Sequence, residues 1–98
     1  MIKFAGGVRC PKSVIIVAAA ANARATLKLP GDTYVTSLND SSHMPTSKHY
    51  TDEAADFRTR DLEPVQVAAW AAMCRQRLGA AYQVIVERDH LHIEYDAR

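Results

Sequence analysis

Residues 90–95, His-Leu-His-Ile-Glu-Tyr, alternate between polar and apolar side chains without interruption. Successive side chains of a β-strand point to opposite faces of its sheet, so this period of two predicts a strand with one buried face. Leu91 and Ile93 are expected on the buried face. His90 and His92 would lie side by side on the other face, which is therefore the expected location of a functional site.

Two segments are predicted to be helices that cover the buried face. The first spans about residues 11–27, where Pro11 suits the first turn and small apolar residues recur at helical spacing. The second begins within residues 61–64, which offer an acidic cap and Pro64, and ends near Gly79. Its apolar stripe is expected to be core and not a cofactor site. The residues predicted to face the core are Val14, Val17, Ala18, Ala21 and Ala25 in the first helix, and Val67, Trp70, Ala71, Cys74 and Leu78 in the second.

The remaining segments complete an α+β pattern. Further strands are predicted at residues 33–38, 54–59 and 82–88. In the second of these, the period of two places Asp56 on the open face and Phe57 in the core. The polar stretch 39–47 is predicted to be a loop. We therefore expect one domain, residues 1–98, with two helices on one face of a small, mainly antiparallel sheet and the candidate site on its other face.

Composition narrows the classes of function. A net charge of +1 and the lack of a basic stripe give no case for nucleic-acid binding. No apolar run approaches the roughly 18 residues of a membrane span. Cys10 and Cys74 are expected to be free thiols. The apolar run at residues 14–21 follows basic residues as in a secretory signal, but Pro11 and the length of the basic stretch favour a structural helix.

Imidazoles and carboxylates gather in two runs of the chain. Residues 47–56 read Ser-Lys-His-Tyr-Thr-Asp-Glu-Ala-Ala-Asp, and residues 89–92 read Asp-His-Leu-His. Zn²⁺ accepts both imidazole nitrogen and carboxylate oxygen in a tetrahedral site. Three protein ligands would leave a position for water, which the metal acidifies into a nucleophile near neutral pH. Together the two runs predict a small zinc hydrolase.

The first run resembles the Ser-x-His-x-x-Gly-x-Ala-x-Asp motif of the zinc D-alanyl-D-alanine carboxypeptidase and endopeptidase family, whose fold is shared with hedgehog signalling domains. Ser47, His49, Ala54 and Asp56 match this motif in register. The second run resembles the Asp-His-x-His motif of the same family. The resemblance covers roughly residues 34–95 and implies a hedgehog-like metallopeptidase fold.

The resemblance also implies a role for each matching residue. Asp89 would be the general base that draws a proton from the attacking water and returns it to the leaving amine. His90 would hydrogen-bond the carbonyl oxyanion or the base. Ser47 would orient a ligand or touch the substrate. The implied zinc ligands are His49, Asp56 and His92.

A second assignment of the general base and the zinc ligand in the C-terminal run is open. Glu87 and His90 also read as Glu-x-x-His, which would make Glu87 the base and His90 the ligand. The His-x-His pattern favours Asp89 with His92. Glu94 lies on the histidine face beyond the motif, where it would either hydrogen-bond a ligand from behind or be solvated, and the solvated reading is favoured.

Two departures from the family bear on the substrate. Asp52 stands where the family has Gly. If the backbone there needs a positive φ, Asp would lower the stability of the fold to some extent. Residues 36–40 lack the Arg with which family members clamp a terminal carboxylate, which weakens a carboxypeptidase and favours an endopeptidase or a substrate anchored elsewhere. Arg58 and Arg9 are candidates to replace that Arg, and nothing in the sequence places either one.

The function expected from these patterns is a zinc peptidase that cuts peptidoglycan-type peptides containing D-amino acids. The alternative is a non-catalytic zinc-binding module for attachment to a cell wall or virion. Without a convincing signal peptide, both a phage-encoded protein acting on the cell wall and a cytoplasmic dipeptidase would fit. The sequence leaves the scissile bond and the oligomeric state open.

Overall fold

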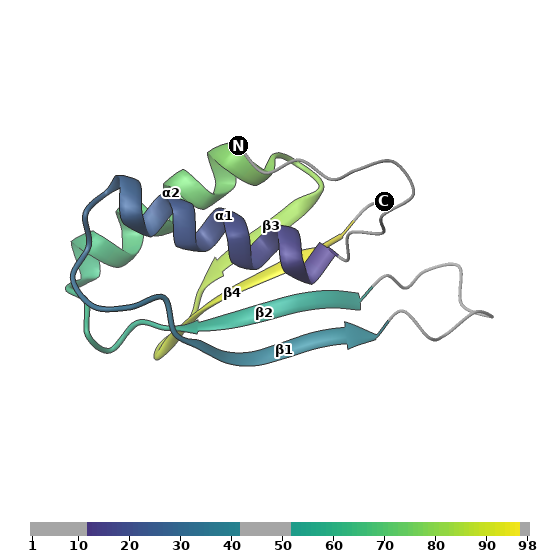
Figure 1. Cartoon of the computed structure of the whole chain (residues 1–98), viewed down its shortest axis with the longest axis horizontal. Coiled ribbons are helices and arrows are strands. Elements are labelled where there is room, and N and C mark those ends of the chain that lie inside the picture. The colour runs from purple at the N-terminus through teal and green to yellow at the C-terminus, as the bar shows by residue number, and fades with distance from the viewer. Residues whose placement is uncertain (1–11, 42–51, 97–98) are drawn as a thin grey trace.

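Two helices cover one face of a four-stranded sheet in the computed structural model, which describes residues 12–41 and 52–96 (Figure 1). Each neighbouring pair of strands is antiparallel, and the strand order is β1-β2-β4-β3. The α+β class predicted from the sequence is therefore confirmed. The elements are α1 (Lys12–Thr26), β1 (Val35–Ser41), β2 (Asp52–Arg58), α2 (Pro64–Leu78), β3 (Tyr82–Val86) and β4 (His90–Tyr95).

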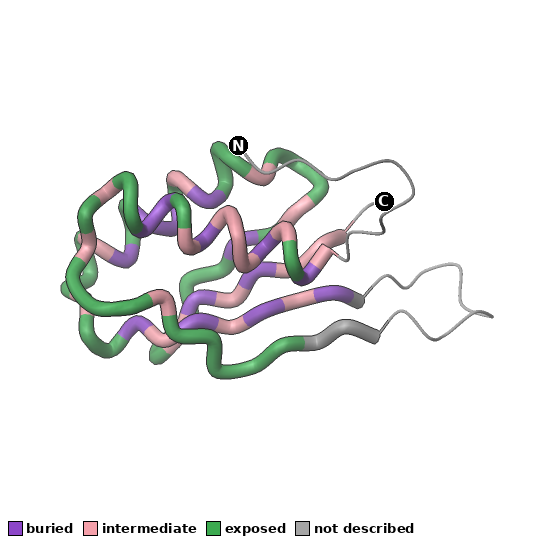
Figure 2. Tube along the Cα trace, viewed as in Figure 1, coloured by how far each residue is buried: buried purple, intermediate pink, exposed green. Residues whose placement is uncertain are grey.

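Strand β4 lies between β2 and β3 and contains the alternating polar and apolar residues 90–95. Leu91 and Ile93 are fully buried under the helices, as predicted. His90 and His92 are half-buried, and the alternation places them on the opposite, open face. Figure 2 shows buried and partly exposed residues alternating along the strands, so β2 and β4 present a polar face away from the helices.

The core is centred on Trp70 of α2. Its ring packs edge-to-face on Phe57 of β2, with 5.8 Å between the ring centroids. Its Nε1–H donates a hydrogen bond of 3.0 Å to the carbonyl oxygen of Ala20 in α1, so one side chain joins both helices to the sheet. The predicted stripe of α2 is confirmed, since Val67, Ala71 and Cys74 are buried with Trp70. Burial also raises the pKa of the Cys74 thiol to about 12, so the thiol stays neutral.

The core face predicted for α1 is largely wrong. Val17 packs against the core, but Val14 is 46% exposed and Ala25 is also exposed. The physical reason is that nearly every residue of this helix is small or apolar, so the spacing of apolar residues does not single out one face. The face that is buried includes two polar residues, and its members are Ser13, Ile16, Ala20, Ala23 and Arg24.

Arg24 is tolerated in the core because its charge is matched. Its guanidinium lies 2.9 Å from the carboxylate of Asp61 and stacks over the ring of Trp70, 4.9 Å from the centroid. It also donates a hydrogen bond to the carbonyl oxygen of Pro30. A Cβ added to Gly31 would lie 2.5 Å from Oδ2 of Asp61, so this close approach requires glycine. The ion pair ties the end of α1 to the start of α2.

Strand and helix ends differ from the prediction by a few residues. β1 continues to Ser41, so residues 39–41 belong to a strand that pairs with β2 and not to the predicted loop. Asp52 lies opposite Ser41 in extended backbone, and its φ is not positive. The departure from the family Gly therefore carries no backbone strain here. The turn after β3 begins at Glu87, whose N–H donates to the carbonyl oxygen of His90 at 2.9 Å.

None of the described helices is long and apolar enough to cross a membrane. Cys74 is a free cysteine, whereas Cys10 lies outside the described residues. The helix start at residues 61–64 is confirmed, with Glu63 at the N-cap and Pro64 in the first turn. The side chain of Gln66 accepts the Glu63 N–H at 2.8 Å.

Candidate metal centre

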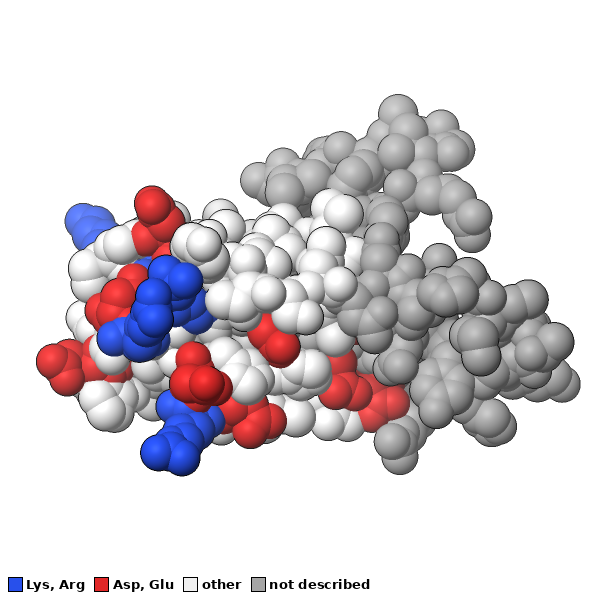
Figure 3. Space-filling model, turned by 90° about the horizontal axis from the view of Figure 1, so that it is seen from below, with Lys and Arg blue, Asp and Glu red and all other residues white. Residues whose placement is uncertain are grey.

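The open face of the sheet carries the candidate site. Antiparallel pairing sets Asp56 of β2 directly opposite His92 of β4, and Arg58 opposite His90. Cross-strand neighbours of this kind have side chains within contact distance on one face. Acidic and basic side chains lie close together on the described part of this face, which Figure 3 views from the sheet side.

Asp56 and His92 form a close polar pair on this face. Oδ1 of Asp56 lies 2.6 Å from Nδ1 of His92. The other ring nitrogen, Nε2, lies 2.8 Å from Oε1 of Glu94. Carboxylate oxygens only accept hydrogen bonds, so both ring nitrogens carry a proton in this arrangement. His92 is thus an imidazolium between two carboxylates.

The pKa of His92 reflects two opposing effects. Partial burial of the ring lowers the pKa, and it is the largest single contribution. The hydrogen bonds and negative charges of Glu94 and Asp56 together outweigh it, so the pKa of His92 is raised above its usual value. A site that holds an extra proton this firmly offers negative charge to any cation. A metal ion that binds there must replace the proton on Nδ1.

The donor atoms present fit zinc. Carboxylate oxygen and imidazole nitrogen are both normal zinc ligands, and Asp56 and His92 bring one of each together. Glu94 would remain as the group that accepts the second N–H of the ring, an arrangement that orients metal-bound histidines in proteins. The described residues contain no group of three metal-ligating side chains. His49, the predicted third ligand, lies outside the described residues, as does Ser47.

Asp89 and His90 flank the Asp56–His92 pair. Nδ1 of His90 lies 2.7 Å from Oδ1 of Asp89, and its Nε2 lies 3.8 Å from Oδ1 of Asp56. The hydrogen bond from His90 holds the pKa of the Asp89 carboxyl below its usual range, so Asp89 is ionised at neutral pH. An ionised carboxylate can accept a proton, as the predicted general base must.

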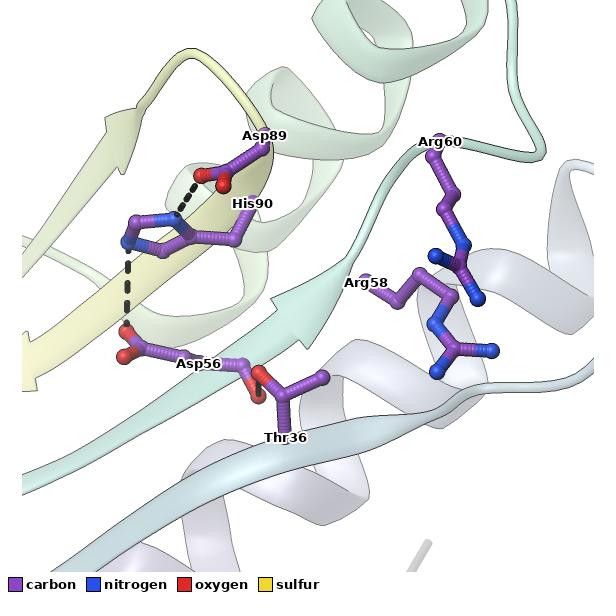
Figure 4. A pocket seen from close by; sticks show the side chains of 6 residues that line it. All are labelled: Thr36, Asp56, Arg58, Arg60, Asp89 and His90. Atoms are coloured by element: carbon purple, nitrogen blue, oxygen red, sulfur yellow. Dashed lines mark hydrogen bonds and ion pairs between the residues drawn. The ribbon is translucent and has the colours of Figure 1, made fainter.

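Two hollows of the open face meet at Asp56. The larger is a pocket of about 330 Å³. Figure 4 shows Asp89 and His90 on one side of it and two arginines on the other, with Asp56 and Thr36 between them. The smaller, of about 110 Å³, lies where Ala54 leaves space beside the Asp56–His92 pair. The larger pocket is lined by Thr36, Asp56, Arg58, Arg60, Asp89 and His90, and the smaller by Ser37, Ala54, Ala55, Asp56 and His92.

The pocket bears on the two registers that the sequence left open. Asp89 lines the pocket, whereas Glu87 is exposed and is not among its lining residues. His92, not His90, makes the short contact with Asp56. Both observations favour Asp89 as the base and His92 as the ligand.

Sequence reasoning gave too little weight to Glu94 and to the arginines. Glu94 was expected to be solvated, but it is half-buried and hydrogen-bonded to His92. The signal was present, because Glu94 is two residues after His92 and therefore on the same face of the strand. The same rule places Arg58 on the face of Asp56, and Arg60, in the turn after β2, lines the same pocket.

Replacing Glu94 by Gln is expected to lower zinc affinity by about 10- to 100-fold, because the ring of His92 loses its charged orienting partner. Zinc affinity would be measured by competition with a chromophoric chelator. Glu87→Gln is the matched control, since Glu87 is exposed and belongs to the adjoining turn. Equal affinity in wild type and Glu94→Gln would show that Glu94 does not support the metal. A loss confined to Glu87→Gln would favour the other register.

Comparisons with known proteins return nothing for this chain. No protein-family model, no curated protein and no solved structure matches it. The chemistry assigned to the site therefore comes from its own residues and from the motif resemblance.

Proposed function

We propose that this protein is a zinc-dependent peptidase that hydrolyses peptidoglycan-type peptides containing D-amino acids. The observation that carries the proposal is the cross-strand pair of Asp56 and His92, whose donor atoms converge on an open sheet face. Asp89 and His90 lie beside that pair in a pocket that solvent and substrate can reach. The substrate class comes from the resemblance of residues 47–56 and 89–92 to zinc D-alanyl-D-alanine peptidases.

The metal would be held by Asp56 and His92 from the sheet and by His49 as the third protein ligand. Zinc at such a site supplies Lewis acidity and lowers the pKa of water to near neutral. Glu94 would keep the ring of His92 in one orientation through the bond to Nε2. The half-buried position of the pair limits competition from bulk water for the donor atoms.

The remaining residues would move protons and stabilise charge. Asp89 would accept a proton from the attacking water and deliver it to the nitrogen of the leaving amine. His90 would donate a hydrogen bond to the negative oxygen that develops on the scissile carbonyl. Its Nδ1 contacts Oδ1 of Asp89, which fixes the ring and directs Nε2 toward Asp56.

Metal content is the first test of the proposal. Elemental analysis of protein purified without added metal is expected to find about one zinc per chain, as for a mononuclear hydrolase. Zinc should be lost in Asp56→Ala, His92→Ala and His49→Ala. It should be retained in His90→Ala, which separates His92 from His90 as the ligand. Zinc-loaded protein would then be assayed on peptidoglycan fragments with D-alanyl termini.

Two results would remove the proposal. One is protein without metal whose thermal stability does not change when zinc is added, because zinc that binds the folded state must stabilise it. The other is zinc-loaded protein that hydrolyses none of the peptides. The second result, with one zinc bound, would favour the alternative of a non-catalytic zinc-binding module.

A further inference from the structure

We propose that strand β1 is the surface through which two copies of this chain associate. The two β1 strands would pair antiparallel and join two four-stranded sheets into one continuous sheet. The inference goes beyond the proposed function, because it depends on the free edge of the sheet and not on the metal. It identifies the partner as a second copy of this chain.

Strand β1 is an open edge of the sheet. The strand order is β1-β2-β4-β3, and no described element pairs with the outer side of β1 (Figure 1). An edge strand presents a row of backbone N–H and C=O groups that have no partner in the sheet. Residues 34–38 are all exposed, and Figure 2 shows them in green along the edge. Their free backbone groups can therefore pair with another strand.

The other edge of the sheet, β3, is covered. Nη2 of Arg75, in α2, donates a hydrogen bond of 2.8 Å to the carbonyl oxygen of Val84, in the middle of β3. A side chain bound at this position obstructs the pairing of an added strand. With one edge covered, pairing through β1 stops at two copies, because a twofold contact uses the same surface on both. The expected assembly is a closed dimer and not a fibre.

The side chains of β1 on the helix side of the sheet are apolar. Val35 pairs with Phe57, which is buried under the helices. Leu38 pairs with Ala55, which is buried there as well. The register shift between residues 35 and 37 places Val35 and Leu38 on this same face, where regular alternation would separate them. Val35 is nevertheless 36% exposed and Leu38 54% exposed, so an added strand would remove apolar surface from water.

This stretch is complementary to itself in the antiparallel direction. With the twofold axis between Thr36 and Ser37, Val35 would lie opposite the partner's Leu38, and Leu38 opposite the partner's Val35. Side chains directly opposite each other in a sheet are about 4.5–5.5 Å apart at Cβ, so each pair would make an apolar contact. Residues 34–38 carry no charge that would repel a copy. The self-match is the reason for assigning this edge to a second copy and not to an unrelated peptide.

Pairing through β1 would also place a second chain beside the candidate site. Thr36 lines the larger hollow of the open face, and Ser37 lines the smaller one. The partner's strand would lie about 4.8 Å beyond them, which is one strand spacing. Three such spacings, or about 14 Å, would separate β2 from its copy. The two candidate sites would therefore open on the same face of the joined sheet, each bordered by the other chain.

The association of the full chain in solution tests the inference. Sedimentation velocity would be measured from about 1 to 500 µM, because a short strand pair is smaller than a standard interface and a dissociation constant of about 10–100 µM is expected. At the highest concentration the mass should approach twice the 10.8 kDa of one chain. Leu38→Lys should raise the dissociation constant at least about 10-fold, because it sets a charge against an apolar partner. Val35→Lys, at the other member of the pair, should do the same.

Ile85→Lys and Val65→Lys are the matched controls. Ile85 is 36% exposed in β3, and Val65 is 74% exposed in α2. Both variants add the same charge at an exposed apolar position outside β1, so both should keep the dissociation constant of wild type. Circular dichroism of each variant verifies that it is folded at the concentrations used.

A wild-type chain that stays monomeric at about 500 µM would overturn the inference. A dimer that neither Leu38→Lys nor Val35→Lys weakens would also overturn it, and a dimer lost in Ile85→Lys alone would place the contact at β3 instead. None of these results bears on the proposed function, which depends on zinc content and hydrolysis. Conversely, a dimer that Leu38→Lys disrupts, in a protein that binds no zinc, would support the interface and remove the peptidase.

Discussion

Asp89→Asn is expected to lower the rate of peptide hydrolysis by about 10²- to 10⁴-fold while zinc stays bound, which is the usual contribution of a general base. Asn cannot accept the proton of the attacking water, and its size is nearly that of Asp. Asp89 is exposed at the turn before β4 and its partner is His90, so the fold does not depend on it. The measurement is kcat for a D-alanyl peptide, with zinc content determined on the same sample.

Asp32→Asn is a matched control, because Asp32 is also exposed and lies outside the pocket. It should leave both kcat and zinc content unchanged. A wild-type rate in Asp89→Asn would contradict the role of Asp89. If Glu87→Gln then lost the activity, the base would be Glu87 and the ligand His90. Loss of zinc in Asp89→Asn would instead place Asp89 among the groups that hold the metal.

The residues whose sheet face was predicted correctly lie in segments where polar and apolar side chains alternate strictly. In residues 90–95 every second side chain is apolar, and a shift of one residue would bury two histidines. The pattern therefore allows one orientation of the strand. The same holds for Asp56 and Phe57, whose faces were also predicted correctly. Period-two patterns with large apolar and charged residues leave little freedom.

For helix α1, the spacing of apolar residues did not predict which face is buried. Eight of its residues from Val14 to Ala21 are apolar, so each face has enough apolar surface to be buried. The face is chosen by partners far along the chain, chiefly Trp70, which bonds to Ala20 and lies under Arg24. A buried arginine contradicts the binary pattern, and its partners Asp61, Trp70 and Pro30, all outside the helix, explain it. No local window contains that information.

The candidate site was predictable only in part for the same reason. Asp56 and His92 are 36 residues apart, and their contact depends on the pairing of β2 with β4, which periodicity does not fix. The motif resemblance supplied the link that spacing could not. It could not supply Glu94 or the two arginines, because they lie outside the matching positions. These residues emerged once the register placed them on the same face.

Trp70→Ala is expected to lower the free energy of unfolding by about 3–5 kcal/mol, the range for a buried aromatic side chain cut back to alanine. Trp70 is fully buried, packs on Phe57, and satisfies the carbonyl oxygen of Ala20. The free energy of unfolding of a domain is roughly 5–15 kcal/mol in total, so this one substitution removes a large fraction of it. Chemical denaturation followed by circular dichroism measures the change. Val65→Ala is the control on the same helix: Val65 is 74% exposed, and its loss should cost less than about 0.5 kcal/mol.

The same variant links the core to the metal centre. Phe57 packs against the ring of Trp70 and is the neighbour of Asp56 in β2. The ring of Trp70 therefore stabilises the strand that carries the proposed ligand Asp56. Zinc that binds only the folded state should raise the free energy of unfolding by about 2.7 kcal/mol at a concentration 100 times its dissociation constant. Trp70→Ala is therefore expected to recover part of its lost stability when zinc is added. A stability that zinc does not change in Trp70→Ala, while wild type is stabilised, would mean that the ring is needed to assemble the site as well as the core.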